Sequence, residues 1–347
     1  MHTSSSNPAD HRLSALKQWL ATLAPRHGLD LATLAPASSD ASFRRYFRLS
    51  SGTKTLIVMD APPPQEDCRP FVHVTQLLQQ ANVHVPDILE HDLDQGFLLL
   101  SDLGRHTYYQ VIQAQPADHE LQAIYRDALD ALVKLQQAPV TGLPVYDKQR
   151  LHDELTVFPE WYIARHCGVE LSDAQKNTLA GIFERLVNDA AGQPRVLVHR
   201  DFHSPNLMLA AAGGNPGVID YQDALQGPIS YDIASLVMDA RTTWEEPQQL
   251  DWAIRYWEKA RAAALPVPDD FADFHRQYEW MSLQRNLRIL GVFARLAWRD
   301  DKTHYLDHIP RVLAYTRQVA GRYNALRALI PLLDTLENKP PAYGYTF

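Results

Sequence analysis

The segment His199–Asn206 constrains this chain more than any other stretch of its sequence. It reads His-Arg-Asp-Phe-His-Ser-Pro-Asn, and an Ile-Asp pair ending at Asp220 follows it. Phosphoryl transfer needs a carboxylate beside the attacking hydroxyl and oxygen ligands for Mg²⁺. Asp201 would supply the catalytic carboxylate, and Asn206 and Asp220 would bind the metal. The pattern therefore predicts an ATP-dependent phosphotransferase.

Short strands are expected on both sides of this segment. Residues 195–198 are apolar and β-branched after Arg195, and they predict a strand that ends just before the loop. Residues 207–209 and 217–219 predict two further strands joined by a glycine-rich turn. This hairpin would bring Asn206 and Asp220 together, and their amide and carboxylate oxygens are ligands that suit Mg²⁺.

Other interpretations of the same residues stay open. His199, Asp201 and His203 alternate along an extended segment and could bind one metal ion, as in metallohydrolases, but Asn206 and Asp220 would then have no role. All could also be ordinary loop residues that satisfy backbone groups. We assign His203 to the substrate site, where its ring would also organise the loop.

Composition excludes several classes of protein. The 347 residues, 46% of them apolar, are enough for two lobes with a substantial core. A net charge of -8 argues against nucleic-acid binding. Two cysteines, Cys68 and Cys167, stand at no metal-like spacing and predict free thiols. The sequence has no apolar signal core and no membrane-length apolar stretch, so we expect a cytoplasmic protein without membrane contact or an obligate protein partner.

The order of the predicted elements indicates an α+β chain of two lobes. A first helix over 13–23 would end at Pro25. Strands are expected at 42–49, 55–59, 87–91 and 97–100, with a helix at 70–80. Long helices follow, at 118–137, 150–166, 173–189, 231–240, 248–264, 270–298 and 305–333. We predict a nucleotide-covering N-lobe at 1–100, a hinge at 101–105, and a C-lobe at 106–347 with the catalytic loop and the acceptor site. ATP would lie in the cleft.

By these motifs the chain resembles the aminoglycoside phosphotransferase and choline kinase-like branch of the protein-kinase-like fold. The matching residues are His199–Asn206, Ile219-Asp220 and Tyr231-Asp232. The resemblance implies a bilobal fold with a small β-rich N-lobe and a larger, mainly helical C-lobe. It also implies that Asp232 braces the catalytic loop, with His199 as a second support. A plain helix N-cap is the alternative for Asp232.

A closer resemblance is to the N-acetylmuramate/N-acetylglucosamine anomeric kinases of bacterial cell-wall (peptidoglycan) recycling. It is carried by Asp40–Arg48, Ile57–Pro63, Leu100–Gly104 and Gln284–Leu287, which run through nearly the whole chain. The resemblance implies an amino-sugar acceptor that ATP phosphorylates on its C1 hydroxyl. An aminoglycoside, choline or another small alcohol is the alternative acceptor, and a catalytically silent nucleotide-binding protein is the remaining class.

The chain departs from the general kinase pattern where the phosphates should be held. No lysine stands near residues 58–60, and the helix expected at 69–80 contains no acidic residue, so the usual Lys-Glu pair is absent. Arg44 and Arg45 lie in the segment equivalent to the phosphate-covering loop, and we expect a guanidinium there to bind phosphate. For each of them, and for Arg48, a solvated strand face is the alternative.

The adenine is expected to contact the hinge. Backbone groups of Ser101, Asp102 and Leu103 would hydrogen-bond its edge, because a hinge segment offers N–H and C=O groups outside regular structure. An ordinary linker between lobes is the alternative.

The acceptor sugar is expected to contact two helical segments, 153–161 and 279–298. The first contributes Glu154 and Trp161, and the second contributes Arg285 and Arg288. An arginine fork could bind the lactyl carboxylate of N-acetylmuramate, and Glu154 could accept hydrogen bonds from sugar hydroxyls. The alternatives are salt bridges between neighbouring helices for the charged residues and a core position for Trp161.

Overall fold

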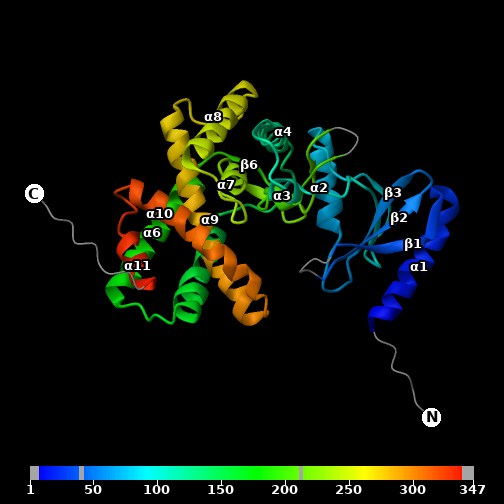
Figure 1. Ribbon diagram of the computed structural model, residues 1–347, viewed down its shortest axis with the longest axis horizontal. Coiled ribbons are helices and arrows are strands. Elements are labelled where there is room, and N and C mark those ends of the chain that lie inside the picture. The colour runs from blue at the N-terminus through cyan, green and yellow to red at the C-terminus, as the bar shows by residue number, and fades with distance from the viewer. Residues whose placement is uncertain (1–7, 39–42, 211–213, 338–347) are drawn as a thin grey trace, which may run out of the picture. The chain divides into compact units, whose positions relative to one another are not determined.

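The protein was analysed as a computed structural model, which describes residues 8–38, 43–210 and 214–337 (Figure 1). Its contacts divide the chain into two compact units. The first comprises Met1–His106 with Met208–Asp223, and the second comprises Thr107–Leu207 with Ala224–Phe347. Residues 208–223, which we expected in the C-lobe, thus group with the first unit. The Val218 N–H donates to the carbonyl of His84 at 2.7 Å, and Tyr221 stacks on Phe71.

The first unit is built on an antiparallel sheet of five strands in the order β1-β2-β3-β5-β4. Its elements are α1 (Pro8–His27), β1 (Leu29–Ser38), β2 (Arg45–Ser51), β3 (Lys54–Asp60), α2 (Arg69–Gln80), β4 (Ile88–Asp92) and β5 (Phe97–Ser101). Alternate residues of β2, Phe47 and Leu49, are buried and pack with Leu16 and Leu20 of α1. This core fixes the sheet that carries the arginines of the expected phosphate site.

Two features of the first unit differ from the sequence prediction. Strand β1 was not predicted, because its Ala- and Pro-containing sequence lacks β-branched alternation; it is an edge strand, where Pro36 is tolerated. Helix α1 does not end at Pro25 but continues to His27, where Gly28 adopts a left-handed φ of +61°. The first residue of the strand expected at 42–49 lies outside the described residues.

The second unit is mainly helical, as predicted. Its helices are α3 (Tyr108–Gln113), α4 (Asp118–Gln136), α5 (Lys148–Val157), α6 (Asp173–Gly192), α7 (Tyr231–Val237), α8 (Glu246–Ala262), α9 (Phe271–Arg299), α10 (Ile309–Arg322) and α11 (Leu329–Leu336). A π-helix, η1 (Phe158–His166), follows α5, and 3₁₀ turns occupy Ser204–Asn206 and Thr303–His308. Strand β6 (Arg195–Val198) pairs with β9 (Leu225–Pro228) in this unit. The short strands β7 (Leu207–Met208) and β8 (Gly217–Val218) form a separate pair, and β8 lies in residues grouped with the first unit.

Helix α9 runs through the middle of this unit and contacts α5, α6, α7, α10 and η1 (Figure 1). The single helix predicted at 150–166 is divided into α5 and η1 after Val157, where Gly291 of α9 lies against the chain. A Cβ at Gly291 of α9 would lie 2.4 Å from the carbonyl oxygen of Val157, so only glycine permits this approach. The helix predicted at 305–333 is likewise three elements, Thr303–His308, α10 and α11. Helix α9 thereby carries its side chains to the catalytic loop.

Candidate active site

The catalytic loop contains a strained residue that is held from two sides. Arg200 has a left-handed φ of +78°, a conformation that costs a non-glycine residue about 1–3 kcal/mol. The carboxylate of Asp232, at the start of α7, accepts hydrogen bonds from the N–H groups of His199 at 2.7 Å and Arg200 at 3.0 Å. From α9, Arg285 donates to the carbonyl of Arg200 at 2.8 Å. Asp232 therefore holds two successive peptide N–H groups of the loop.

Arg285 has a different role from the one expected. Its second amino group donates to the hydroxyl of Ser235 at 2.7 Å, its guanidinium lies 4.4 Å from the centre of the Tyr231 ring, and only 5% of the residue is exposed. These contacts use the guanidinium for the loop and for α7. We therefore revise its assignment from acceptor binding to loop support.

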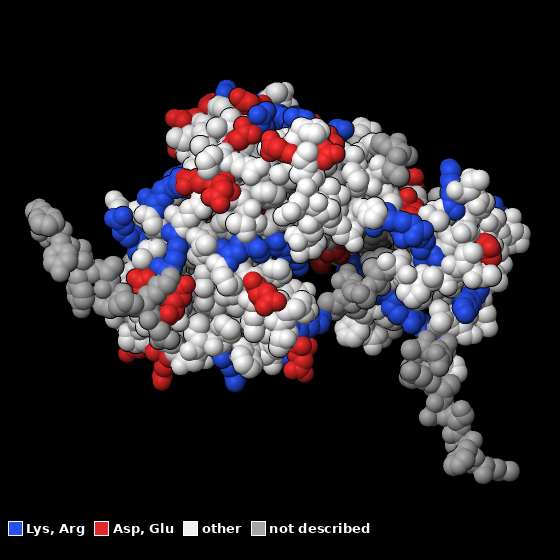
Figure 2. Space-filling model, in the orientation of Figure 1, with Lys and Arg blue, Asp and Glu red and all other residues white. Residues whose placement is uncertain are grey.

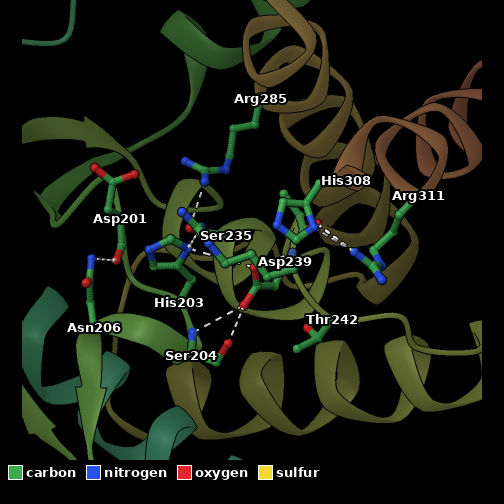
Figure 3. A network of polar contacts seen from close by, with 12 residues as sticks. Asp201, His203, Ser204, Asn206, Ser235, Asp239, Thr242, Arg285, His308 and Arg311 are labelled. Carbon is green, nitrogen blue, oxygen red and sulfur yellow. Dashed lines mark hydrogen bonds and ion pairs between the residues drawn. The ribbon is translucent and has the colours of Figure 1, made fainter. Parts of the chain in front are cut away.

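Asp201 is ionised at neutral pH. Burial acts to raise the pKa of this carboxyl, but its electrostatic interactions, with the guanidinium of Arg288 first among them, outweigh burial and lower the pKa from 3.8 to about 2. The carbonyl of Asp201 accepts a hydrogen bond from Nδ2 of Asn206 at 3.0 Å, which fixes the amide of Asn206 against the loop (Figure 3). The loop thus presents a charged carboxylate beside an oriented amide.

The ring of His203 is tied to a buried acid that sequence reasoning missed. Asp239, which is 1% exposed, accepts hydrogen bonds from the hydroxyl of Ser204 at 2.6 Å and from its N–H at 3.3 Å (Figure 3). Nδ1 of His203 lies 3.8 Å from Asp239 and 3.3 Å from the guanidinium of Arg241. Burial lowers the pKa of His203 from 6.5 to about 4, so the ring is neutral at physiological pH. Asp239 stands in no motif that would have revealed it.

The metallohydrolase alternative does not fit these positions. Nδ1 of His199 accepts a hydrogen bond from the N–H of Asp201 at 3.3 Å, whereas His203 faces Asp239 and Arg241. Within the part of the chain that the structure describes, no group of three or more His, Cys, Asp or Glu side chains is arranged to hold a metal ion.

Glu154 joins Arg200, which directly precedes Asp201, to Arg288 of α9. Its carboxylate forms ion pairs with Arg200 and, at 3.2 Å, with Nε of Arg288, and it accepts a hydrogen bond from the Tyr146 hydroxyl. We expected Glu154 to bind sugar hydroxyls, but these contacts use both of its oxygens, so we revise its role to holding the two arginines. Arg288, whose side chain is 20% exposed, pairs with Glu154, and its charge helps to lower the pKa of Asp201. Trp161 is half-buried on η1.

In the first unit, two of the three arginines near β2, Arg45 and Arg48, form ion pairs with acids of the same unit. Arg45 pairs across the strands with Asp60, which is fully buried and also binds Arg12 at 2.6 Å. Arg48 donates two hydrogen bonds to Asp102, at 2.6 and 2.9 Å. We therefore revise the assignment of Arg45 as a phosphate ligand, and neither residue lies on a solvated strand face.

Arg44 and Asp220 lie next to each other in the first unit. Nη2 of Arg44 is 3.6 Å from Oδ1 of Asp220, and its Nε is 3.7 Å from Oε2 of Glu66. Asp220 follows β8 with a left-handed φ of +65°, and its side chain is 35% exposed. The amide of Asn206 and the carboxylate of Asp220 are hard oxygen donors and fit Mg²⁺ chemically, although the two residues belong to different units. Their joint metal site stays a prediction.

Part of the segment that was predicted to bind adenine is hydrogen-bonded within the first unit. The N–H of Ser101 donates to the carbonyl of Asp87 at 2.9 Å, so it cannot also hydrogen-bond adenine, and that part of the prediction is revised. The side chain of Asp102 binds Arg48 and Thr55, while Leu103 packs against Gly217. Contacts from the backbone of Asp102 and Leu103 to adenine stay a prediction.

Comparison with known proteins identifies the family. Residues 33–269 match the model of a phosphotransferase enzyme family. The chain belongs to this family. It is 48% identical to the N-acetylmuramate/N-acetylglucosamine kinase of Pseudomonas aeruginosa over 94% of this chain and 97% of that protein. It is 44% identical to the kinase of the same name from Neisseria meningitidis over 96% of this chain and 98% of that protein. The resemblance read from the sequence is confirmed.

Solved structures of phosphotransferases confirm the predicted fold class. An ADP-bound aminoglycoside phosphotransferase, APH(2'')-Ib, is similar with a TM-score of 0.58 at 15% identity, over 87% of this chain and 98% of that chain. The choline kinase LicA from Streptococcus pneumoniae is similar with a TM-score of 0.55 at 11% identity, over 89% of this chain and 99% of that chain. At this identity the likeness concerns the fold alone.

Charged side chains of both signs lie on the surface. Acidic and basic side chains are both exposed on the face shown in Figure 2, so basic residues do not cover that face. Over the described ranges, none of the helices is long and apolar enough to cross a membrane.

We expect His203 to make the stability of this phosphotransferase depend on pH. The unfolded chain takes up a proton on this ring near pH 6.5, whereas the folded protein does so only near pH 4. Stability is therefore lost as the pH falls through 6.5 and towards 4, by about 2 kcal/mol between pH 7.5 and 5. The variant His203→Gln should lose about that much less than the wild type over this interval, as measured by urea unfolding at both pH values. Equal losses in the two proteins would contradict the assignment.

Proposed function

We propose that this protein is an ATP-dependent kinase that phosphorylates N-acetylmuramate and N-acetylglucosamine on the C1 hydroxyl. The observation that carries the proposal is near-full-length identity of 44–48% to kinases of these two sugars. The intact catalytic loop supports it, with Asp201 ionised and Asn206 hydrogen-bonded to it. The product would be a sugar 1-phosphate made from amino sugars recovered from the bacterial cell wall.

Asp201 is assigned as the catalytic residue. An ionised carboxylate is a weak base, so it accepts a hydrogen bond from the C1 hydroxyl and orients that oxygen, and the proton passes to the carboxylate late in the transfer. Positioning of the hydroxyl therefore contributes more than proton abstraction. We assign Mg²⁺ to Asn206 and Asp220; when bound there, the ion neutralises charge on the phosphates of ATP.

Arg288 is the best-supported contact to the acceptor. It lies within the electrostatic field of Asp201, which is assigned to the reacting hydroxyl. Glu154 pairs with both Arg200 and Arg288, and its contact with Arg288 is to Nε at 3.2 Å. The other N–H donors of the Arg288 fork suit a carboxylate, whereas a cationic acceptor such as choline or an aminoglycoside is repelled by a guanidinium. We propose that Arg288 binds the lactyl carboxylate of N-acetylmuramate.

The reaction is tested by incubating the protein with ATP and Mg²⁺ and, separately, N-acetylmuramate, N-acetylglucosamine, choline and an aminoglycoside. Phosphorus NMR of the products should show a glycosyl phosphate with both amino sugars. The variant Asp201→Asn should lose turnover by at least about a hundredfold while it still binds ATP. Phosphorylation of choline or the aminoglycoside alone would refute the proposed acceptors. Near-normal turnover by the variant would refute the assignment of Asp201 as the catalytic residue.

Acceptor recognition is tested by the variant Arg288→Gln. We expect the KM for N-acetylmuramate to rise at least about tenfold more than the KM for N-acetylglucosamine, because only the former carries a carboxylate for a charged hydrogen bond. Any effect that the substitution has through Asp201 applies to both sugars, so it cancels in the ratio of the two KM changes. Equal changes in the two KM values would show that Arg288 does not bind the lactyl group.

A further inference from the structure

We propose that Arg44, positioned by Glu66, is the cation that binds the phosphates of ATP, in place of the lysine and glutamate that this chain lacks. The inference rests on the proposed kinase function and deepens it. It assigns one arginine out of three candidates, and it assigns a partner acid that the sequence pattern did not indicate.

An acid with a structural role stands in the segment 58–60, where a phosphate-binding lysine was expected and is absent. Asp60, at the end of β3, is fully buried and stands directly opposite Arg45 of β2 in the sheet. Arg12 approaches the same carboxylate from α1, at 2.6 Å. A buried carboxylate offers no positive charge of its own, and both guanidiniums are held against it, so Asp60 cannot replace a lysine. The phosphate-binding charge must therefore come from another element.

Arg44 directly precedes β2 and lies between two carboxylates. Its guanidinium is 3.6 Å from Asp220, the proposed metal ligand, and 3.7 Å from Glu66. Its side chain is 13% exposed, so these acids hold it beside the residue that we assign to the metal. Arg45 and Arg48, in contrast, face Asp60 and Asp102. Of these three arginines, Arg44 is the one next to Asp220.

The acid that pairs with Arg44 is Glu66, which lies in a turn and not in a helix. Helix α2 carries no acidic residue, but Glu66 stands in the turn before it, where its N–H donates to the carbonyl of Pro62 at 3.1 Å. A guanidinium has five N–H donors in a fixed fork, so Arg44 can keep its contact with Glu66 and still donate to phosphate oxygens. Glu66 is therefore a positioning residue: it acts on the phosphates only through Arg44.

The test is calorimetric titration of the full-length protein, without acceptor, with Mg²⁺ and a nonhydrolysable ATP analogue, and separately with adenosine. Arg44→Gln should weaken binding of the analogue at least about tenfold, because a charged hydrogen bond to phosphate is lost, and should leave adenosine binding within about twofold. Arg44→Lys should recover part of the affinity. Glu66→Gln should weaken binding of the analogue, by less than Arg44→Gln, and again spare adenosine.

Two exposed neighbours provide matched controls with the same changes in charge. Arg69→Gln and Asp67→Asn alter side chains that are 63% and 55% exposed, and both should bind the analogue as the wild type does. Wild-type affinity in a folded Arg44→Gln variant would overturn the inference and leave the kinase proposal standing. An effect of Arg44→Gln without one of Glu66→Gln would overturn the role of Glu66. A wild-type protein that does not bind the analogue would overturn the proposed function as well.

Discussion

The clamp on the Arg200 peptide is the interaction on which the rest of the site depends. Asp232 holds the N–H groups of His199 and Arg200, and Arg285 holds the carbonyl on the other side. A left-handed residue persists only where its surroundings over-determine it, and here two buried charged groups do so. By fixing the Arg200 peptide, the clamp determines the position of Asp201, the next residue. It also orients the side chain of Arg200 towards Glu154, with which it forms an ion pair. Helices α7 and α9 therefore determine the geometry of a loop that lies far from them in the sequence.

Charge in this protein is used mainly to position groups. Asp201 has a low pKa because its electrostatic interactions, with Arg288 first among them, outweigh burial, so it suits the orientation of a hydroxyl better than the removal of its proton. Single carboxylates repeatedly hold two guanidiniums: Glu154 holds Arg200 and Arg288, while Asp60 holds Arg12 and Arg45. Removing one partner of such a group leaves a buried charge uncompensated, so most of these arginines are structural.

Features that depend on a local pattern or on a motif could be predicted from the sequence. Strand β6 was predicted at its observed bounds, and the loop residues stand in the order that the motif requires. The roles of the arginines could not be predicted, since neighbours such as Arg44 and Arg45 look alike until the register of β2 and β3 puts Arg45 opposite Asp60. Arg285 was misassigned for the same reason: a polar residue on a core helix indicates a buried partner but does not identify it. Asp239 and Glu66 belong to no motif, and only tertiary contacts reveal them.

The most direct test of the account compares turnover with nucleotide affinity in the variant Arg285→Met. This change removes the donor to the Arg200 carbonyl and one of the charges that lower the pKa of Asp201, while Asp201 itself is unchanged. Arg276→Met, on the same helix, is the control for loss of an arginine. The account predicts that kcat falls about tenfold to a hundredfold, because the loop relaxes, while the Kd for ADP stays within about twofold of the wild type. A folded Arg285→Met protein with the kcat of the wild type would contradict the claim that this clamp places the catalytic residue.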